Sequence, residues 1–189
     1  MADIPEGRLQ FDQLPFYNVG VDYFGPLTVK LGRSTVKRYG CVFTCLTMRA
    51  IHIEIAHSLE SDSFISALRR FIARRGKPNK IFCDNGTNFV GAEKILRNAL
   101  KLFNAEKIQG FCSQEGIEFA FNAPSASHHG GAWERMIRTI RKIFQNLLGR
   151  QILNDEGLLT FIAEVESIIN SRPLVPISFS DYQSRTLDA

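Results

Sequence analysis

The stretch NVGVDYF, residues 18–24, decides how the fold is interpreted, because it combines β-branched and aromatic residues with a single acid, Asp22. Such residues favour a β-strand, and the turn-forming pair Gly25-Pro26 predicts that the strand ends there. A hairpin turn and two more β-rich runs follow along the chain, at residues 31–34, 41–46 and 50–56. The segment therefore predicts a three-stranded meander that begins with the acid-bearing strand.

The last of these runs alternates apolar and polar residues. Its isoleucines stand at positions 51, 53 and 55, with His52 and Glu54 between them. This period of two predicts a strand with one buried face, formed by the isoleucines.

Helical and β-rich segments alternate after the meander. Ser61 and Asp62 offer an N-cap for the first helix, and Gly76 ends it, with Pro78 close behind. Short strands are expected at residues 80–83 and 117–121, and helices at residues 91–103, 106–115, 132–148 and 155–171. A meander followed by strands that alternate with helices predicts an α/β fold, in which helices flank a mixed five-stranded sheet.

The bulk composition fits one domain. The chain has 189 residues, of which 44% are hydrophobic, enough to bury a core. We expect this domain at residues 18–174, a polar lead-in arm at residues 1–17 and a loose tail at residues 175–189. No apolar run reaches the roughly 18 residues that span a bilayer, and no secretory signal begins the chain, so no membrane partner is expected. Four scattered cysteines do not make a disulfide framework, which favours the nucleus and cytoplasm.

Positive charge gathers in two segments. The formal net charge is +4 and the pI is about 9.0. Residues 69–80 hold six cationic side chains and no acid, and residues 133–150 hold five against the single acid Glu134. Clusters of this kind favour a nucleic-acid partner, although a solvated surface produces the same pattern.

Three acids stand where elements begin or end. Asp22 lies inside an apolar strand, where a charge is costly unless it is paired or binds a metal. Asp84 follows a predicted strand and precedes a turn, and Glu134 opens the most amphipathic helix. Each also has an ordinary explanation: a strand-end acid that faces water, the first residue of a turn, and an acid that the helix dipole favours.

The helix that begins with this last acid carries cations on the same face. Arg138, Arg141 and Lys142 lie four, seven and eight residues after it. Such a face offers a carboxylate for a metal beside cations for phosphates, and one or two Mg²⁺ or Mn²⁺ ions can support in-line cleavage of nucleic acid. His128 and His129 are an alternative source of a catalytic base, but paired histidines in a Gly-rich loop are more often surface or substrate-contact groups.

Four short motifs follow one another along the chain. They are VGVDYFGP at residues 19–26, DNGTNF at 84–89, PSASHHGGAWER at 124–135 and NSRPL at 170–174. In this order they resemble the signatures of the integrase cores of retroviruses and LTR retrotransposons, and the resemblance runs from residue 4 to residue 174. The first motif, together with FIARRG at residues 71–76, is most similar to integrases of BEL/Pao elements.

The resemblance implies an RNase H-like fold and metal-dependent cleavage and joining of DNA. By position it assigns the metal ligands to Asp22, Asp84 and Glu134, which would bind one or two Mg²⁺ or Mn²⁺ ions. It also makes residues 122–131 the mobile active-site loop. Forty-nine residues separate the second and third acids, a longer spacing than in retroviral enzymes and one that suits the BEL/Pao type.

The resemblance also implies the partners. These are the DNA ends of the element and the target DNA, bound in the nucleus by a homodimer or a higher homo-oligomer, without a small-molecule cofactor. The residues expected to contact nucleic acid are Arg138, Arg141, Lys142, Asn85, Ser127 and His128.

Other interpretations remain open at this point. The chain has no His-His-Cys-Cys pattern, so we expect no zinc module, and Cys41 and Cys45 are expected to be small core residues. A relic or domesticated copy would be a catalytically idle module for DNA binding or dimerisation. An RNase H-type nuclease would act on RNA–DNA hybrids instead. The three intact acids favour an enzyme, and the Asp-Asn-Gly and Trp-Glu-Arg motifs favour an integrase.

Overall fold

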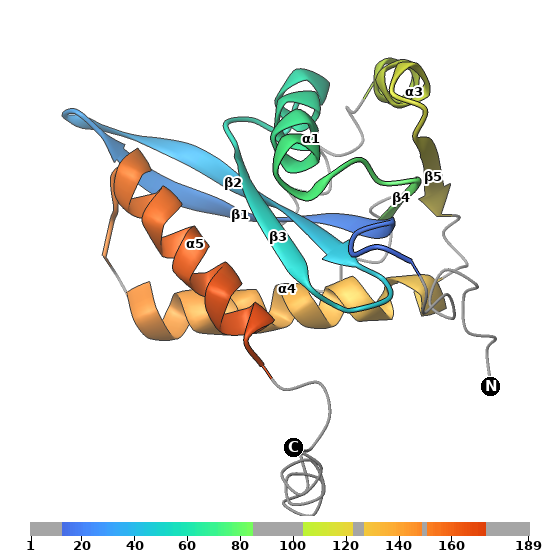
Figure 1. The fold of residues 1–189 in the computed structure, drawn as a ribbon. Coiled ribbons are helices and arrows are strands. Elements are labelled where there is room, and N and C mark those ends of the chain that lie inside the picture. Colours follow the sequence, from blue (N-terminus) through green and yellow to red (C-terminus); the bar gives the residue numbers. More distant parts are fainter. Residues whose placement is uncertain (1–12, 85–103, 123–126, 149–150, 173–189) are drawn as a thin grey trace, which may run out of the picture.

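The structure, a computed structural model, describes residues 13–84, 104–122, 127–148 and 151–172. In chain order its elements are β1 (Asn18–Leu31), β2 (Ser34–Cys45), β3 (Ile51–Ala56), α1 (Ser61–Arg75), β4 (Lys80–Asp84), α3 (Ala105–Gln114), β5 (Glu118–Asn122), α4 (Ser127–Leu148) and α5 (Asp155–Asn170). They form a mixed five-stranded sheet with helices on both faces, which confirms the predicted fold class (Figure 1).

The sheet has the strand order β3-β2-β1-β4-β5, with β1 at its centre. Strands β1, β2 and β3 form the predicted antiparallel meander. Strand β4 runs parallel to β1, and β5 runs parallel to β4. The strand that carries Asp22 is therefore hydrogen-bonded on both sides and is held in the middle of the sheet.

Strand β1 continues beyond the point where the sequence predicts its end. Its register with β2 shifts between Phe24 and Leu27, and pairing then resumes to the end of the strand. Gly25 has a φ of +122°, and a Cβ there would lie 3.2 Å from the carbonyl oxygen of Arg38. The prediction that Gly25-Pro26 stops the strand was wrong, because a local irregularity absorbs these residues without ending the sheet.

Helices cover both faces of the sheet (Figure 1). On the first face, α1 and α3 bury an aromatic core in which the rings of Phe43 and Phe71 stack with centroids 4.3 Å apart. On the second face, α4 and α5 bury another core, in which Phe144 packs edge-on against Phe24 at 5.2 Å. The two faces thus have separate cores, and β1, β2 and β3 contribute to both through their alternating side chains.

Helix α1 begins at the predicted place but with a different cap. Its N-cap is Glu60, which makes no capping hydrogen bond through its side chain. Ser61, predicted as a cap, accepts a hydrogen bond from the backbone N–H of Asn104 at 2.9 Å instead. Gly76 ends the helix as predicted.

Helix α4 begins earlier than predicted, at Ser127. Residues 127–131 are therefore helical and do not belong to a loop, which corrects the expected active-site loop at 122–131. The glycines in this segment are poor helix formers, but the packing of a long amphipathic helix outweighs weak local propensity.

The other helices and the two parallel strands agree with the predictions to within one or two residues, the usual uncertainty of such boundaries. The helix predicted at residues 91–103 lies outside the described residues. Cys41 and Cys45 are buried in the core beneath α1, as predicted. In the part of the chain that the structure describes, no helix is long and apolar enough to cross a membrane.

Candidate active site

Asp22 is the one predicted metal ligand whose side chain the structure describes. It is 5% exposed, and it accepts a hydrogen bond from the backbone N–H of Tyr23 at 2.7 Å. Val21 and Tyr23 belong to the core beneath α1, so strand alternation turns Asp22 toward the opposite face, which α4 and α5 cover. A carboxylate removed from bulk water must be satisfied by donors or by a cation, and the Tyr23 N–H is one such donor.

Asp84 is the last residue of β4, the strand next to the one that carries Asp22. In the parallel pairing, Val21 of β1 lies opposite Cys83 of β4. Residues 22 and 84 are the next along their strands, so their backbones are neighbours across the same two strands. Asn85 lies outside the described residues. The fold thus brings the backbone positions of two predicted ligands together at the centre of the sheet.

Glu134 lies in the N-terminal half of α4, where the structure describes its backbone but not its side chain. Three positions later a buried stripe begins at Ile137 and runs to Phe144. Because Phe144 packs on Phe24, two residues along β1 from Asp22, this helix covers the same face of the strand as the acid. Helix α4 therefore carries position 134 on the face toward which Asp22 is turned.

The predicted nucleic-acid contacts on α4 are partly described. Arg138 and Lys142 are exposed, and Arg141 is half-buried. Ser127 and His128 are the first two residues of the helix, and the structure does not describe their side chains. The helix thus presents a cationic strip to solvent, on the same element as the third predicted acid.

The chemistry of the predicted ligands fits a hard divalent cation. All three are carboxylates, and Mg²⁺ and Mn²⁺ prefer oxygen ligands. Among the described side chains, which do not include those of Asp84 and Glu134, no group of three His, Cys, Asp or Glu residues is arranged to hold a metal. For the predicted metal site, the described residues therefore show one side chain, that of Asp22, and the backbone positions of the other two acids.

A network of charged side chains lies at the edge strand β3, and the sequence pattern did not reveal it. All six residues of β3 are buried, so His52 and Glu54 are covered as well as the isoleucines. His52 Nε2 lies 2.9 Å from Glu54 Oε1, and His52 Nδ1 lies 3.1 Å from Glu166 Oε2 on α5. The backbone N–H of Ile53 also donates to Glu166 Oε2 at 2.9 Å. A charged network therefore ties α5 to the edge of the sheet.

Helix α1 supplies further cations to this network. Arg70 Nε lies 2.7 Å from Glu54 Oε2, and Arg74 Nη1 lies 2.9 Å from Glu54 Oε1. Arg75 pairs with Glu166. Three elements, β3, α1 and α5, are thus joined through the buried carboxylate of Glu54 and the half-buried carboxylate of Glu166.

The network shifts the pKa of its members in the directions expected of paired charges. Burial alone would lower the pKa of His52, but its hydrogen bonds to Glu166 and Glu54 raise it above the ordinary value. Burial alone would raise the pKa of Glu54, but hydrogen bonds to His52 and Arg70 hold it below the ordinary value. The sequence feature that could have indicated this network is a His and a Glu two residues apart on a strand, followed by an arginine-rich helix.

Protein-family models give no match to the chain, and no curated protein matches it. Solved structures do match. The HTLV-2 integrase catalytic core domain in complex with magnesium, in its dimeric form, aligns with a TM-score of 0.57 and 20% identity, over 86% of this chain and 91% of that one. The trimeric form of the same domain aligns with a TM-score of 0.53 and 18% identity, over 88% of this chain and 92% of that one.

A third structure shows the same likeness. A chain of the simian T-cell lymphotropic virus intasome in complex with the PP2A regulatory subunit B56 gamma aligns with a TM-score of 0.60 and 16% identity. The alignment covers 94% of this chain and 62% of that chain. The sheet order and the flanking helices of this protein are therefore those of the RNase H-like fold of integrase catalytic cores.

Proposed function

We propose that this chain is an integrase catalytic core of the BEL/Pao type, which cuts and joins DNA strands with divalent metal ions. The observation that carries the proposal is the register of β1 and β4, which makes residues 22 and 84 neighbours on a strand pair at the centre of the sheet. Helix α4, which carries residue 134, packs on the same face of β1. This arrangement supports a shared site for three acids that are far apart in the sequence.

In the proposed site, Asp22, Asp84 and Glu134 hold one or two Mg²⁺ or Mn²⁺ ions through their carboxylates. A bound divalent ion activates the attacking oxygen and offsets charge on the phosphate and the leaving oxygen. The chain contributes rigidity, because the Tyr23 N–H orients the Asp22 carboxylate and β1 is paired on both sides. A ligand on such a strand keeps its geometry more precisely than one on a loop.

The cationic strip of α4 holds the DNA in this proposal. Arg138, Arg141 and Lys142 offer charge-assisted hydrogen bonds to phosphate oxygens. The buried stripe anchors the helix on the sheet, so these cations keep a fixed spacing from the acid on the same helix. The proposed contact surface is completed by Asn85, Ser127 and His128.

We extend the proposal to the assembly and its setting. Residues 18–174 form the catalytic unit, and it works in the nucleus as a homodimer or a higher homo-oligomer on the element ends and the target DNA. The matching structures support this extension, because they include a dimeric and a trimeric integrase core and an intasome.

The test is Mn²⁺-dependent processing of DNA by the purified chain. A labelled branched DNA that mimics a strand-transfer product should be cut and resealed with Mn²⁺, and EDTA should abolish the reaction. Glu134→Gln should be inactive, whereas Asp62→Asn, which neutralises a side chain that is 74% exposed, should be active. A folded chain that binds the DNA but gives no product with Mn²⁺ or Mg²⁺ would favour the idle DNA-binding module instead.

A further inference from the structure

Strand β3 forms one edge of the described sheet, and it lies between α1 and α5 (Figure 1). It pairs with β2 along one side, so the backbone groups of every second residue point away from the sheet. These residues are Ile51, Ile53 and Ile55, whose outward groups bond to side chains instead of to a strand. A bare edge of this kind is a template for pairing with another chain. In this protein the edge is covered, and all six residues of β3 are buried.

Asn170 at the end of α5 bonds to this edge as a residue of a neighbouring strand would. Its Oδ1 accepts a hydrogen bond from the N–H of Ile51 at 2.8 Å, and its Nδ2 donates to the C=O of Ile51 at 2.9 Å. Two residues that face each other in an antiparallel pair can exchange the same two bonds. The side-chain amide of Asn170 therefore occupies both outward groups of Ile51.

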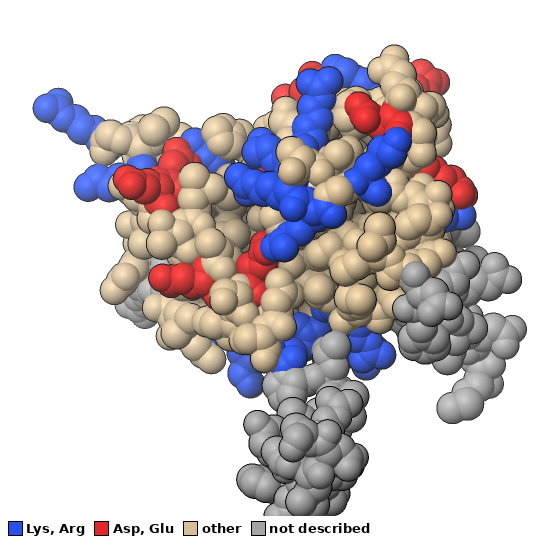
Figure 2. Space-filling model, viewed as in Figure 1, with Lys and Arg blue, Asp and Glu red and all other residues tan. Residues whose placement is uncertain are grey.

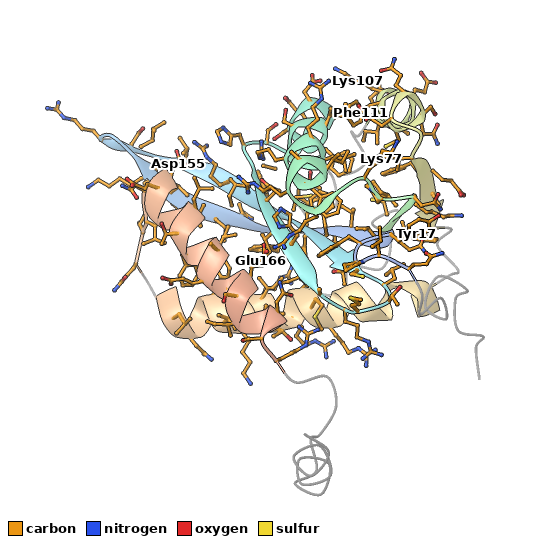
Figure 3. The ribbon with its side chains drawn as sticks, in the orientation of Figure 1. Tyr17, Lys77, Lys107, Phe111, Asp155 and Glu166 are labelled. Carbon is orange, nitrogen blue, oxygen red and sulfur yellow. The ribbon has the colours of Figure 1, made fainter. Side chains whose placement is uncertain are left out.

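Two further side chains continue this cover along β3. Glu166 accepts a hydrogen bond from the N–H of Ile53 at 2.9 Å, and Figure 3 shows Glu166 where α5 approaches the strand. Arg70 of α1 donates to the C=O of Ile55 at 2.6 Å. Four residues rise about 6 Å along a helix and two residues span about 6.6 Å along a strand, so α5 can reach alternate strand residues. We call Asn170, Glu166 and Arg70 the edge cover.

Other contacts hold the edge cover in position. Arg75 of α1 pairs with Glu166. Beyond the end of α5, Arg172 Nη2 donates to the C=O of Arg49, in the turn before β3, at 2.7 Å. Figure 2 shows Lys and Arg side chains over α1 meeting acidic side chains on the α5 side. Helices from both faces of the sheet thus fix the side chains that cover the strand.

The sequence of β3 is suited to pairing with itself. Its six residues, IHIEIA, include three isoleucines and no Pro or Gly, a composition that favours extended pairing. In an antiparallel pair of two copies centred on Ile53, His52 of each copy lies opposite Glu54 of the other. The isoleucines at positions 51 and 55 also face each other, and both kinds of cross-strand pair are favourable.

We propose that Asn170, Glu166 and Arg70 prevent β3 from pairing with β3 of a second copy. Contacts between folded copies must then use other surfaces, and β3 becomes available for pairing only when α5 moves away from it. The NSRPL motif, whose Asn170 and Arg172 attach the end of α5, thereby has a role that involves neither metal nor DNA. This inference does not rest on the proposed catalysis.

The test opens the edge with Asn170→Ala and Glu166→Ala, which leaves three backbone groups of Ile51 and Ile53 without their partners. The probe is a labelled peptide of residues 50–56, and its binding is measured by fluorescence anisotropy. It should bind the opened chain at least about tenfold more tightly than the parent chain, because these groups become free to pair. A scrambled peptide of the same composition should bind both chains equally.

Pairing between whole chains is measured by sedimentation velocity and by hydrogen exchange. At the same concentration the opened chain should form larger species than the parent chain. The N–H groups of Ile51 and Ile53 should exchange faster in the dilute opened chain and regain protection when it is concentrated. Association without renewed protection of these two groups would contradict pairing through β3.

The matched control removes the same two residue types from α5 and its cap without touching β3. Asn154→Ala deletes the capping hydrogen bond from the N–H of Gly157, and Glu164→Ala changes an exposed side chain. This control should weaken α5 but bind the peptide as the parent chain does. Equal peptide binding by the opened and parent chains, or an equal gain in the control, would overturn the proposal. Melting temperatures check folding, and if the opened chain unfolds, Asn170→Ala alone should still raise peptide affinity about threefold.

Discussion

Asp22 and Glu54 look alike in the sequence, since each is an acid inside an apolar strand, and both are buried in the structure. Their surroundings differ. Glu54 on the edge strand lies within 2.9 Å of nitrogens from His52, Arg70 and Arg74. Asp22 on the central strand accepts the Tyr23 N–H and lies beside the backbone position of a second acid.

Burial of a carboxylate therefore does not define its role, whereas its neighbours do. Cations of the protein already balance Glu54, so its charge serves to join β3 to α1 and α5. In our proposal Asp22 and its acidic neighbour hold a divalent ion. One buried acid should therefore matter for stability, and the other for metal binding and catalysis.

The largest expected effect concerns activity. Asp22→Asn should reduce Mn²⁺-dependent cleavage by at least about a thousandfold, because it removes one charge from a group of ligands that act together. Glu54→Gln should leave the rate per folded molecule little changed, since the edge strand β3 is separated from β1 by β2. Cleavage assays normalised to the folded fraction measure both. The comparison fails if the two variants lose activity to the same extent.

For stability the order should be reversed, so that Glu54→Gln is more harmful than Asp22→Asn. Glu54→Gln should lower the free energy of unfolding by about 2 kcal/mol, because it removes the buried negative charge that faces His52 and two arginines. Asp22→Asn should keep or raise the stability without metal, because it relieves repulsion between neighbouring acids. Urea denaturation in EDTA provides the measurement. A larger loss in Asp22→Asn than in Glu54→Gln would contradict this assignment.

The pH dependence of stability should follow the same network. The pKa of His52 is raised above its ordinary 6.5, so its contribution is full below pH 6.5 and is lost as the pH rises through the raised value. The pKa values of Glu54 and Glu166 are lowered from 4.5, so their contributions are present above pH 4.5 and are lost as the pH falls through the lowered values. The network should therefore stabilise the fold most between pH 4.5 and 6.5.

Histidine variants isolate the alkaline side of this window. His52→Gln should flatten the fall in unfolding free energy above pH 6.5, whereas His57→Gln, at an exposed position, should leave the profile as it is. Denaturation curves at a series of pH values measure the two profiles. If His57→Gln flattened the profile and His52→Gln did not, the network would not be the source of the dependence.

The smallest expected effect is the difference in stability between variants of the two arginines that pair with Glu54. Arg70→Gln should cost about 1 kcal/mol, because Arg70 bonds both Glu54 and the carbonyl of Ile55. Arg74→Gln should cost only about 0.3 kcal/mol, because the Arg74 side chain is 62% exposed and water screens its pair. Thermal melting can rank the two variants. The reverse order would mean that exposure does not set the strength of these pairs.

Much of the fold was predictable because local patterns and tertiary packing agree. The period of two at residues 50–56, the helical spacing after Ser61 and the strand at residues 80–83 all led to elements that the structure contains. The sequence also predicted that Asp84 ends a strand, and the register of β1 and β4 sets that position beside Asp22. No sequence pattern specifies such a register, because it depends on contacts between distant segments.

The parts that were not predicted depend on long-range contacts. The continuation of β1 through Gly25-Pro26 is set by its pairing with β2, and turn-forming residues alone do not reveal this pairing. The burial of His52 and Glu54 depends on side chains from α1 and α5, and Glu166 lies more than a hundred residues further along the chain. A period of two indicates one buried face but does not show that charged partners cover the other.

The most direct test of the central claim is the cleavage activity and melting temperature of Asp84→Asn beside the parent chain. Asn keeps the size of the side chain and forms turns well, but it removes the charge that would hold Mg²⁺ or Mn²⁺. We expect Mn²⁺-dependent cleavage of DNA to fall by several powers of ten, while the melting temperature without metal is unchanged or higher. Retained cleavage in a folded Asp84→Asn chain would show that Asp84 only begins a turn, and it would contradict the three-acid site.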